Sequence, residues 1–261
     1  MLGAMAELNG SPISLDHLQA LALTNYGHFT SIRVEDGHVR GLPLHLARLA
    51  RDCRAVFDTD LDLDRVRDFA RRAVPSSGDC VVRVTIFDPA LDLGHVGNDA
   101  HPHVLVTTRP AGSLPLPAMR VQSVVYTRDM PAVKSVGLFG SLRHRRDSQR
   151  AGFDDALFTD TDSVISEGGT WNVGFVKGDQ VVWPDAECLV GTTMELLRQA
   201  HPSSTATVCL GDLTDFDAAF ATNIGIGVRA INAVDGVTFP DTHPVIEQLR
   251  KEYADVPTDL L

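Results

Sequence analysis

The sequence predicts an α+β fold built around a mixed, barrel-like sheet. In the middle of the chain the strand-like segments outnumber the helical ones, and the helices are interspersed rather than alternating, unlike those of a parallel Rossmann sheet. Of the 261 residues, 44% are apolar and 22% charged, which is the balance of an ordinary globular protein. A chain of this length can form one large domain or two smaller ones.

The first hundred residues mix helices and strands. Apolar residues recur at helical spacing in His45–Phe57, which predicts a helix. Ile13–Leu23 is consistent with a short helix or an extended segment. The stretch 88–103 is rich in Asp, Gly, His and Pro and predicts a long loop. The other expected elements are strands at Phe29–Val34, Cys80–Phe87 and Val104–Thr108, and a helix at Leu63–Val74.

Pro, Gly and Ser gather in Arg109–Pro117, which predicts a domain boundary there. Asp162-Ser163 and Gly178-Asp179 are good hairpin turns, and Asp212–Asp215 is expected to cap a helix over Phe216–Ala221. The other expected elements are strands at Arg120–Tyr126, Ala156–Thr159, Val164–Ser166, Val173–Val176, Val181–Trp183 and Val228–Ala233, and helices at about 140–151, Thr192–Ala200 and Pro244–Tyr253.

The charge and cysteine patterns limit which partners, compartments and metal sites are expected for this protein. A net charge of −11 argues against a nucleic acid or an anionic membrane as partner. The basic run Arg143–Arg146 is interpreted as the solvated face of a helix. The four cysteines are scattered, which predicts buried reduced thiols in a cytoplasmic protein. No spacing predicts a metal site: the acidic alternation Asp58–Asp64 lacks the Gly and Glu of a calcium loop.

Lys134 is the first candidate for chemistry. The chain has only three lysines, and the other two are poor nucleophile candidates: Lys177 lies in a predicted hairpin turn and Lys251 in a charged helix. Lys134 lies in the run Ala132–Val136, which is apolar enough to desolvate an amine. A lysine whose amine is uncharged can form a Schiff base with an aldehyde.

Three further segments supply groups that such an aldehyde cofactor would need. Glu167 ends an apolar strand, where its carboxylate could hold a pyridine nitrogen in its protonated form or could simply be exposed at a turn. Gly191-Thr192-Thr193 opens a helix and could bind phosphate or cap the helix. Arg48 could contact the same phosphate or be a surface arginine. An aldehyde cofactor with a phosphate and a pyridine nitrogen is pyridoxal 5′-phosphate (PLP).

The order and spacing of these residues resemble those of the class IV aminotransferases, the fold-type IV PLP enzymes. The resemblance covers about residues 27–236 and is strongest from Lys134 to Gly168. The matching segments are His45-Leu46-Ala47-Arg48-Leu49, Lys134 with Gly152-Phe153-Asp154-Asp155-Ala156, Ile165-Ser166-Glu167-Gly168 with Asn172, Leu189-Val190-Gly191-Thr192-Thr193, and Thr222-Asn223-Ile224.

The resemblance implies a small N-terminal α+β domain (1–112) and a larger, barrel-like C-terminal PLP-binding domain (113–261), with PLP in the cleft between them, in a homodimer. The implied activity is amino-group transfer between an amino acid or amine and a keto acid. Lys134 is then the Schiff-base lysine and Glu167 the partner of the pyridine nitrogen. The implied phosphate contacts are Arg48, Gly191, Thr192, Thr193, Thr222 and Asn223.

The sequence also departs from the family pattern. Phe139 stands where branched-chain enzymes carry a tyrosine beside the cofactor, and Leu138 where the lyases carry an arginine. The 88–103 loop offers His95, His101 and His103 in place of an arginine for a substrate carboxylate. Two alternatives therefore stay open: an aminodeoxychorismate lyase, which shares the cofactor contacts, and a non-catalytic relative that binds PLP without turnover.

Overall fold

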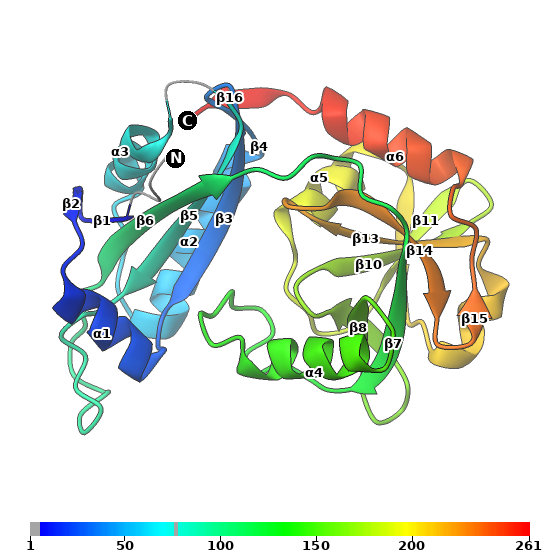
Figure 1. Ribbon diagram of the computed structural model, residues 1–261, viewed down its shortest axis with the longest axis horizontal. Coiled ribbons are helices and arrows are strands. Elements are labelled where there is room, and N and C mark those ends of the chain that lie inside the picture. The colour runs from blue at the N-terminus through cyan, green and yellow to red at the C-terminus, as the bar shows by residue number, and fades with distance from the viewer. Residues whose placement is uncertain (1–5, 76–77) are drawn as a thin grey trace. The chain divides into compact units, whose positions relative to one another are not determined.

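A computed structural model describes residues 6–75 and 78–261 of the chain. The described residues form two compact units, which are presented separately (Figure 1). The first contains the described part of 1–112 together with Val133–Gly137 and Pro257–Leu261. The second contains Ser113–Ala132 and Leu138–Val256. The chain therefore passes between the units four times.

The first unit is an antiparallel seven-stranded sheet, with two helices packed on one face and a third helix packed on the opposite face. Its strand order is β16-β4-β3-β5-β6-β1-β2. The strands are β1 (Ala6–Leu8), β2 (Ser11–Pro12), β3 (His28–Glu35), β4 (His38–Arg40), β5 (Cys80–Phe87), β6 (His103–Pro110) and β16 (Thr258–Leu260), and the helices are α1 (Leu15–Thr24), α2 (Leu42–Phe57) and α3 (Leu63–Ala73). Leu49 of α2 and Val66 of α3 pack on Val34 and Val82 of the sheet in one continuous apolar core.

The second unit is a nine-stranded mixed sheet with helices and loops on both faces. Along the order β12-β11-β10-β13-β14-β7-β8-β9 the pairs β11–β12, β14–β7 and β7–β8 are parallel, and β15 pairs with β14. The strands are β7 (Met119–Val125), β8 (Asp155–Thr159), β9 (Ile165–Gly168), β10 (Asn172–Lys177), β11 (Gln180–Pro184), β12 (Ser203–Ala206), β13 (Ala218–Asn223), β14 (Gly227–Val234) and β15 (Val237–Thr238), and the helices are α4 (Phe139–Arg150), α5 (Thr192–Ala200), the 3₁₀ helix η1 (Leu210–Asp215) and α6 (Pro244–Asp255).

The helix predicted over Phe216–Ala221 is wrong, because Ala218–Ala221 of this segment belong to the central strand β13. Its side chains alternate between two cores: Phe220 packs with one apolar cluster and Ala219 with the other. Phe220 also covers Gly174 of β10, where a Cβ would come within 2.4 Å of its ring. Small residues suit a strand buried on both faces, and that tertiary context overrides the helix propensity of the alanines.

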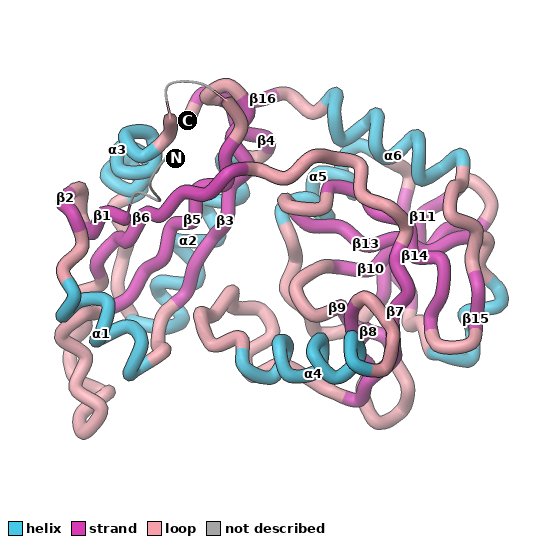
Figure 2. The backbone as a smooth tube through the Cα atoms, viewed as in Figure 1, coloured by secondary structure: helices cyan, strands magenta, loops and turns pink. Residues whose placement is uncertain are grey.

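Several other sequence interpretations can be compared with the structure (Figure 2). Ile13–Leu23 falls largely within helix α1, which Ser14 caps through a bond to the His17 N–H. The stretch 88–102 contains no helix or strand, as predicted. Asp62 caps α3, which supports reading the acidic run as the start of a helix. All four cysteines are free, but only Cys53 and Cys80 are buried.

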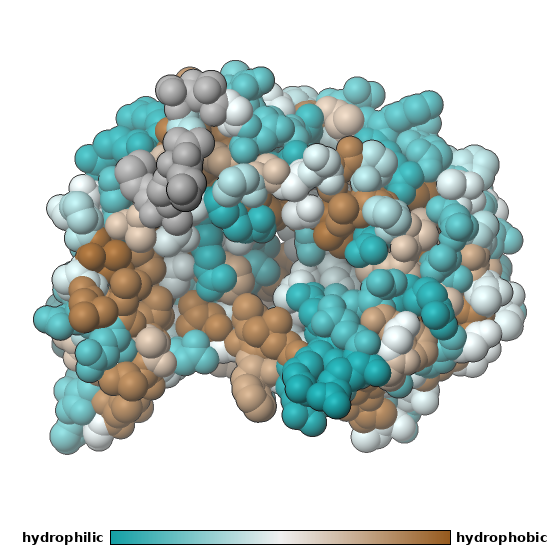
Figure 3. All heavy atoms as spheres, in the orientation of Figure 1, coloured by the Kyte–Doolittle hydropathy of each residue, from teal (hydrophilic) through white to brown (hydrophobic). Residues whose placement is uncertain are grey.

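The basic run on α4 is only partly a solvated face. The surface over α4 is strongly hydrophilic (Figure 3), and Arg143 and Arg146 are exposed. Arg145 is instead only about a quarter exposed and forms an ion pair with Asp155 of β8. Within the described part of the chain, no helix has the length and apolarity needed to cross a bilayer.

Candidate cofactor-binding site

Lys134 lies in the first unit, in a short segment that runs antiparallel beside the beginning of β3. Its carbonyl accepts the N–H of Phe29 at 2.9 Å, and the N–H of Val136 donates to the carbonyl of Gly27 at 3.0 Å. The N–H of Lys134 donates to Oδ2 of Asp52 at 3.0 Å. The residue is half-buried, and its Nζ lies 4.8 Å from the centre of the Phe29 ring. The main chain of Lys134 is therefore fixed by hydrogen bonds, and its amine lies over the ring of Phe29.

Arg48 is buried on α2 and is not a surface arginine, since only 8% of the residue is exposed. Its Nη2 donates to Oγ1 of Thr30 at 2.6 Å, whereas its Nε has no hydrogen-bond partner. Among the described residues no carboxylate lies within 4.0 Å of this guanidinium. Burial lowers the pKa of Arg48 to about 10, although the charge of Asp52 acts in the opposite direction. A buried cation with no carboxylate within ion-pair distance is suited to an anionic ligand.

Two buried histidines lie near these groups. The Nδ1 of His45 lies 2.8 Å from Oγ1 of Thr30, and its pKa is far below the ordinary value because of burial, then the charges of Arg48 and Lys134. His28 is completely buried, and neither of its ring nitrogens has a hydrogen-bond partner. Burial lowers the pKa of His28 to about 4. Both rings are therefore neutral at neutral pH.

Glu167 lies in the second unit, buried in β9 rather than exposed at a turn. Its Oε1 accepts Nε of Arg128 at 2.7 Å, and its Oε2 accepts the N–H of Leu189 at 3.3 Å. The side chains of this ion pair are only 12% and 8% exposed, respectively. These bonds fix the orientation of the carboxylate.

The loop between β9 and β10 is fixed by a network centred on Asp155. Its two oxygens accept Nε1 of Trp171 at 2.8 Å and Nε of Arg145 at 2.9 Å. Arg145 also bonds to the hydroxyl of Thr170 at 2.7 Å. The Trp171 ring lies so close to Gly168 that a Cβ on that residue would come within 2.0 Å of it. The network thus fixes the loop that joins Glu167 to Asn172.

Gly191 and Thr193 are at the beginning of α5, next to the amide of Asn172. Oδ1 of Asn172 accepts the N–H of Gly191 at 3.1 Å, and a Cβ on Gly191 would lie 2.4 Å from that oxygen, so only glycine allows this approach. Gly191 is the N-cap, and no side chain caps the helix. Thr192 and Thr193 are buried, and Oγ1 of Thr193 has no partner. Main-chain N–H groups at a helix start and a free hydroxyl can bind phosphate.

Thr222 pairs across the sheet with Asn172, so it belongs to the same neighbourhood. Its buried Oγ1 is also without a partner. The side chain of Asn223 is already occupied in the β13–β14 turn: its Oδ1 accepts the N–H groups of Gly225 and Ile226 at 2.7 and 2.9 Å. Asn223 thus has a local structural function besides any contact to a ligand.

The structure therefore groups the sequence-selected residues in two sets. Lys134 and Arg48 belong to the first unit, and Glu167, Gly191, Thr192, Thr193, Thr222 and Asn223 to the second. Sequence reasoning missed Asp52 and Arg128, whose partners are 82 and 39 positions away. No local spacing could have indicated these two contacts. Phe139 is 82% exposed at the start of α4.

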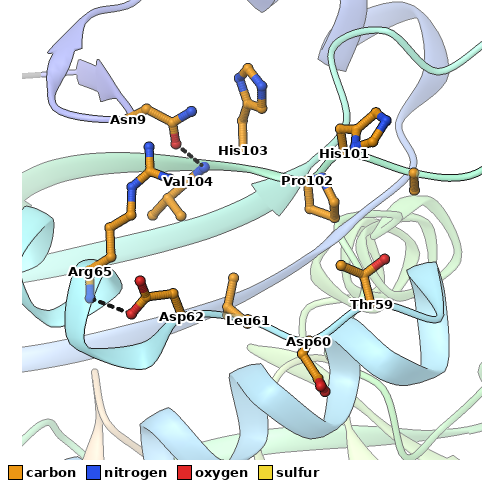
Figure 4. A pocket seen from close by; sticks show the side chains of 11 residues that line it. Asn9, Thr59, Asp60, Leu61, Asp62, Arg65, His101, Pro102, His103 and Val104 are labelled. Atoms are coloured by element: carbon orange, nitrogen blue, oxygen red, sulfur yellow. Dashed lines mark hydrogen bonds between the residues drawn. The ribbon is translucent and has the colours of Figure 1, made fainter.

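A cavity of about 340 Å³ lies elsewhere in the first unit, between the α2–α3 connection and the start of β6 (Figure 4). Arg65, His101 and His103 line it, together with Asp60 and Asp62. Neither Lys134 nor Arg48 is among its lining residues. No group of three or more potential metal ligands is found among the described residues.

Comparisons with known proteins extend these observations. The family model described as "Amino-transferase class IV" matches residues 27–234. A curated relative from Rickettsia bellii, named "Probable branched-chain-amino-acid aminotransferase", is 29% identical over 126 residues, which cover 44% of this chain and 43% of the relative. The matched stretch thus spans less than half the length of that relative.

Two solved structures have the same fold. A branched-chain amino acid aminotransferase from T.th., complexed with N-(5'-phosphopyridoxyl)-L-glutamate, gives a TM-score of 0.85 over 98% of this chain and 94% of that chain, at 19% identity. A hypothetical aminotransferase from Mycobacterium tuberculosis, in its PLP-bound form, gives 0.81 over 97% and 98%, at 18% identity. The predicted fold-type IV class is thereby confirmed. Because the family model covers residues 27–234, the chain belongs to the class IV aminotransferase family.

Proposed function

We propose that this protein is a PLP-dependent aminotransferase that moves an amino group between an amino acid or amine and a keto acid. The observation that carries the proposal is the environment of Lys134, a half-buried amine whose peptide is hydrogen-bonded through both its N–H and its C=O. Membership of the family and the PLP-derived ligands bound by two structural relatives support the same cofactor.

The described residues have the donors that PLP needs. Arg48 is a buried cation without a carboxylate within 4.0 Å, and Thr193 and Thr222 have buried hydroxyls without partners, so these groups suit a phosphate. The N–H groups at the start of α5, from Gly191 onward, add donors of the same kind. We assign Arg48, Gly191, Thr192, Thr193, Thr222 and Asn223 to phosphate binding.

Lys134 and Glu167 are assigned the chemical roles. When bound, PLP supplies an aldehyde that condenses with amines and a pyridine ring that accepts the electrons left on the substrate Cα. Nζ of Lys134 would hold the cofactor at its aldehyde carbon and, when free, would take the proton from the substrate Cα as a general base. Glu167 would hold the proton on the ring nitrogen, and the bond from Arg128 would orient that carboxylate.

Borohydride trapping tests the assignment of Lys134. Protein incubated with PLP and then reduced should carry a pyridoxyl group on the peptide that contains Lys134, and Lys134→Ala should carry none while remaining folded. Lys177→Ala and Lys251→Ala are matched controls that should be labelled like the wild type. A pyridoxyl group on Lys177 or Lys251, or on no lysine, would show the assignment to be wrong.

A substrate comparison separates the proposal from its alternatives. Incubation with an amino donor, branched-chain amino acids first, should convert an added keto acid into its amino acid. Release of pyruvate from aminodeoxychorismate would instead identify a lyase. A PLP absorbance band that does not change with either substrate would indicate a non-catalytic binder, an alternative motivated by the exposed Phe139 in place of a tyrosine.

We also propose that the protein is a homodimer, which light scattering at micromolar concentration would test.

A further inference from the structure

A fully buried carboxylate on α2 contacts the main chain of Lys134. The side chain of Asp52 has no exposed surface. Its Oδ2 accepts the N–H of Lys134 at 3.0 Å, and its Oδ1 accepts Nε and Nη2 of Arg51 at 3.0 and 2.7 Å. A carboxylate is costly to bury unless hydrogen bonds and an opposite charge compensate it. A neutral acceptor would have satisfied the same N–H, so the carboxylate indicates a stronger, charge-assisted bond.

The bond to Asp52 completes a set that fixes the peptide of Lys134 against β3. The carbonyl of Lys134 accepts the N–H of Phe29, and Val136 donates to Gly27 two residues further along. These two bonds attach the segment to the beginning of β3 and the residue before it, whereas Asp52 binds the N–H of Lys134 from helix α2. The segment therefore cannot shift along β3 without breaking the contact to Asp52.

Asp52 also lies one helical turn from Arg48, on the same face of α2. Both residues are buried. Helix α2 thus carries the proposed phosphate-binding guanidinium and, four residues later, the group that holds the proposed Schiff-base lysine. This arrangement fixes the distance between the two groups through a single rigid element.

We infer that Asp52 is a positioning residue for Lys134, which sets the place from which the lysine amine reaches the cofactor aldehyde. The inference rests on the proposed function. Asp52 would act only through the main chain of Lys134 and would not touch the cofactor. Its removal should therefore slow the capture of PLP on Lys134 and change the affinity for the phosphate group little.

The test combines one measurement without cofactor and one with it. Asp52→Ala should increase the hydrogen-exchange rate of the Lys134 amide by about tenfold. The same variant should slow the borohydride-trapped capture of PLP on Lys134 by about tenfold. Its affinity for pyridoxine 5′-phosphate, which has no aldehyde, should change less than about threefold. Asp52→Asn, which keeps an oxygen acceptor, should restore both rates to within about threefold of the wild type.

Cys53→Ala is the matched control, because Cys53 is a fully buried neighbour on the same helix and packs in the apolar core. If Asp52 only stabilised the fold, Asp52→Ala and Cys53→Ala variants would lose capture rate equally at equal loss of melting temperature, and the inference would be overturned. An unchanged exchange rate at the Lys134 amide in Asp52→Ala would also overturn it. Should Asp52→Ala not fold, Asp52→Ser replaces it with the same expectations.

The two proposals fail in different ways. Wild-type protein that captures no PLP on Lys134 overturns the proposed function and the role of Asp52 together. Wild-type protein that captures PLP, with an Asp52→Ala variant that captures it equally fast, overturns the role of Asp52 alone.

Discussion

His28 should make the protein less stable in mild acid, and the size of the effect can be worked out from its burial. The ring is completely buried, and both nitrogens lack a partner. Burial lowers the pKa of His28 in the folded protein to about 4, from an ordinary value of 6.5. The unfolded chain therefore binds a proton below pH 6.5, whereas the folded protein does so only below about pH 4.

The sign of the pH dependence follows from this difference. Above pH 6.5 the ring is neutral in both states and does not change the free energy of unfolding with pH. As the pH falls from 6.5 to 4, the unfolded state gains the proton first, so stability is lost in this window and levels off below it. The total loss due to His28 is about 3 kcal/mol, of which about 2 kcal/mol is lost by pH 5.

Urea unfolding of wild type and His28→Phe at pH 7.5 and pH 5 measures this loss. Phe replaces one ring by another beside Phe57 and removes the two nitrogens, so at pH 7.5 the variant should be within about 1.5 kcal/mol of the wild type. Between pH 7.5 and 5 it should lose about 2 kcal/mol less than the wild type. His45, whose pKa is also lowered by burial, keeps its share of the pH dependence in both proteins. His101→Phe, at an exposed position, is the control. Equal losses in wild type and His28→Phe would refute the reasoning.

Three substitutions in the second unit have distinct expected outcomes. Gly168→Ala should lower the free energy of unfolding by about 2 kcal/mol, because the new Cβ would lie 2.0 Å from Trp171; a wild-type melting temperature would contradict this. Thr193→Val should leave stability unchanged, because the buried hydroxyl has no protein partner to lose. The same variant should bind pyridoxine 5′-phosphate about tenfold more weakly in calorimetry. Unchanged affinity would show that Thr193 does not contact the phosphate. Arg128→Met should lower the free energy of unfolding by about 3 kcal/mol, because it leaves the buried carboxylate of Glu167 without its guanidinium. In chemical denaturation, the double variant with Glu167→Met should recover part of this loss. No recovery would mean that the broken ion pair is not the cause of the loss.

Periodicity and turn signals were sufficient for most elements of the fold, and they failed where neighbours decide the outcome. The helix at His45–Phe57 was predicted, and it begins three residues earlier because Gly41 adopts a φ of +68° before Pro43. The strand β13 was mistaken for a helix because alanine indicates helix unless both faces of the segment are covered. The edge strand β12 (Ser203–Ala206) was missed, since its exposed polar residues have no apolar alternation.

In the candidate site, local motifs suggested candidate residues but not the contacts that fix their positions. Arg48, Glu167 and Gly191 could be selected from short segments because the chemistry requires those residue types. The burial of Arg48 without a carboxylate, and the ion pair of Glu167 with Arg128, depend on segments far apart in the chain. Such contacts are determined by the topology of the sheet, which a single sequence does not specify.

The sheet of the first unit is completed by residues that are synthesised only after the whole of the second unit. Strand β16 pairs with β4, and Leu261 is buried in the first core. On a ribosome that adds about 5–20 residues per second, the edge of β4 stays open for roughly 7 to 30 seconds after residue 112 has been made. During that interval its N–H and C=O groups can pair with another nascent chain. Slower translation of the second half should therefore increase aggregation, and a β16 peptide supplied in trans should reduce it.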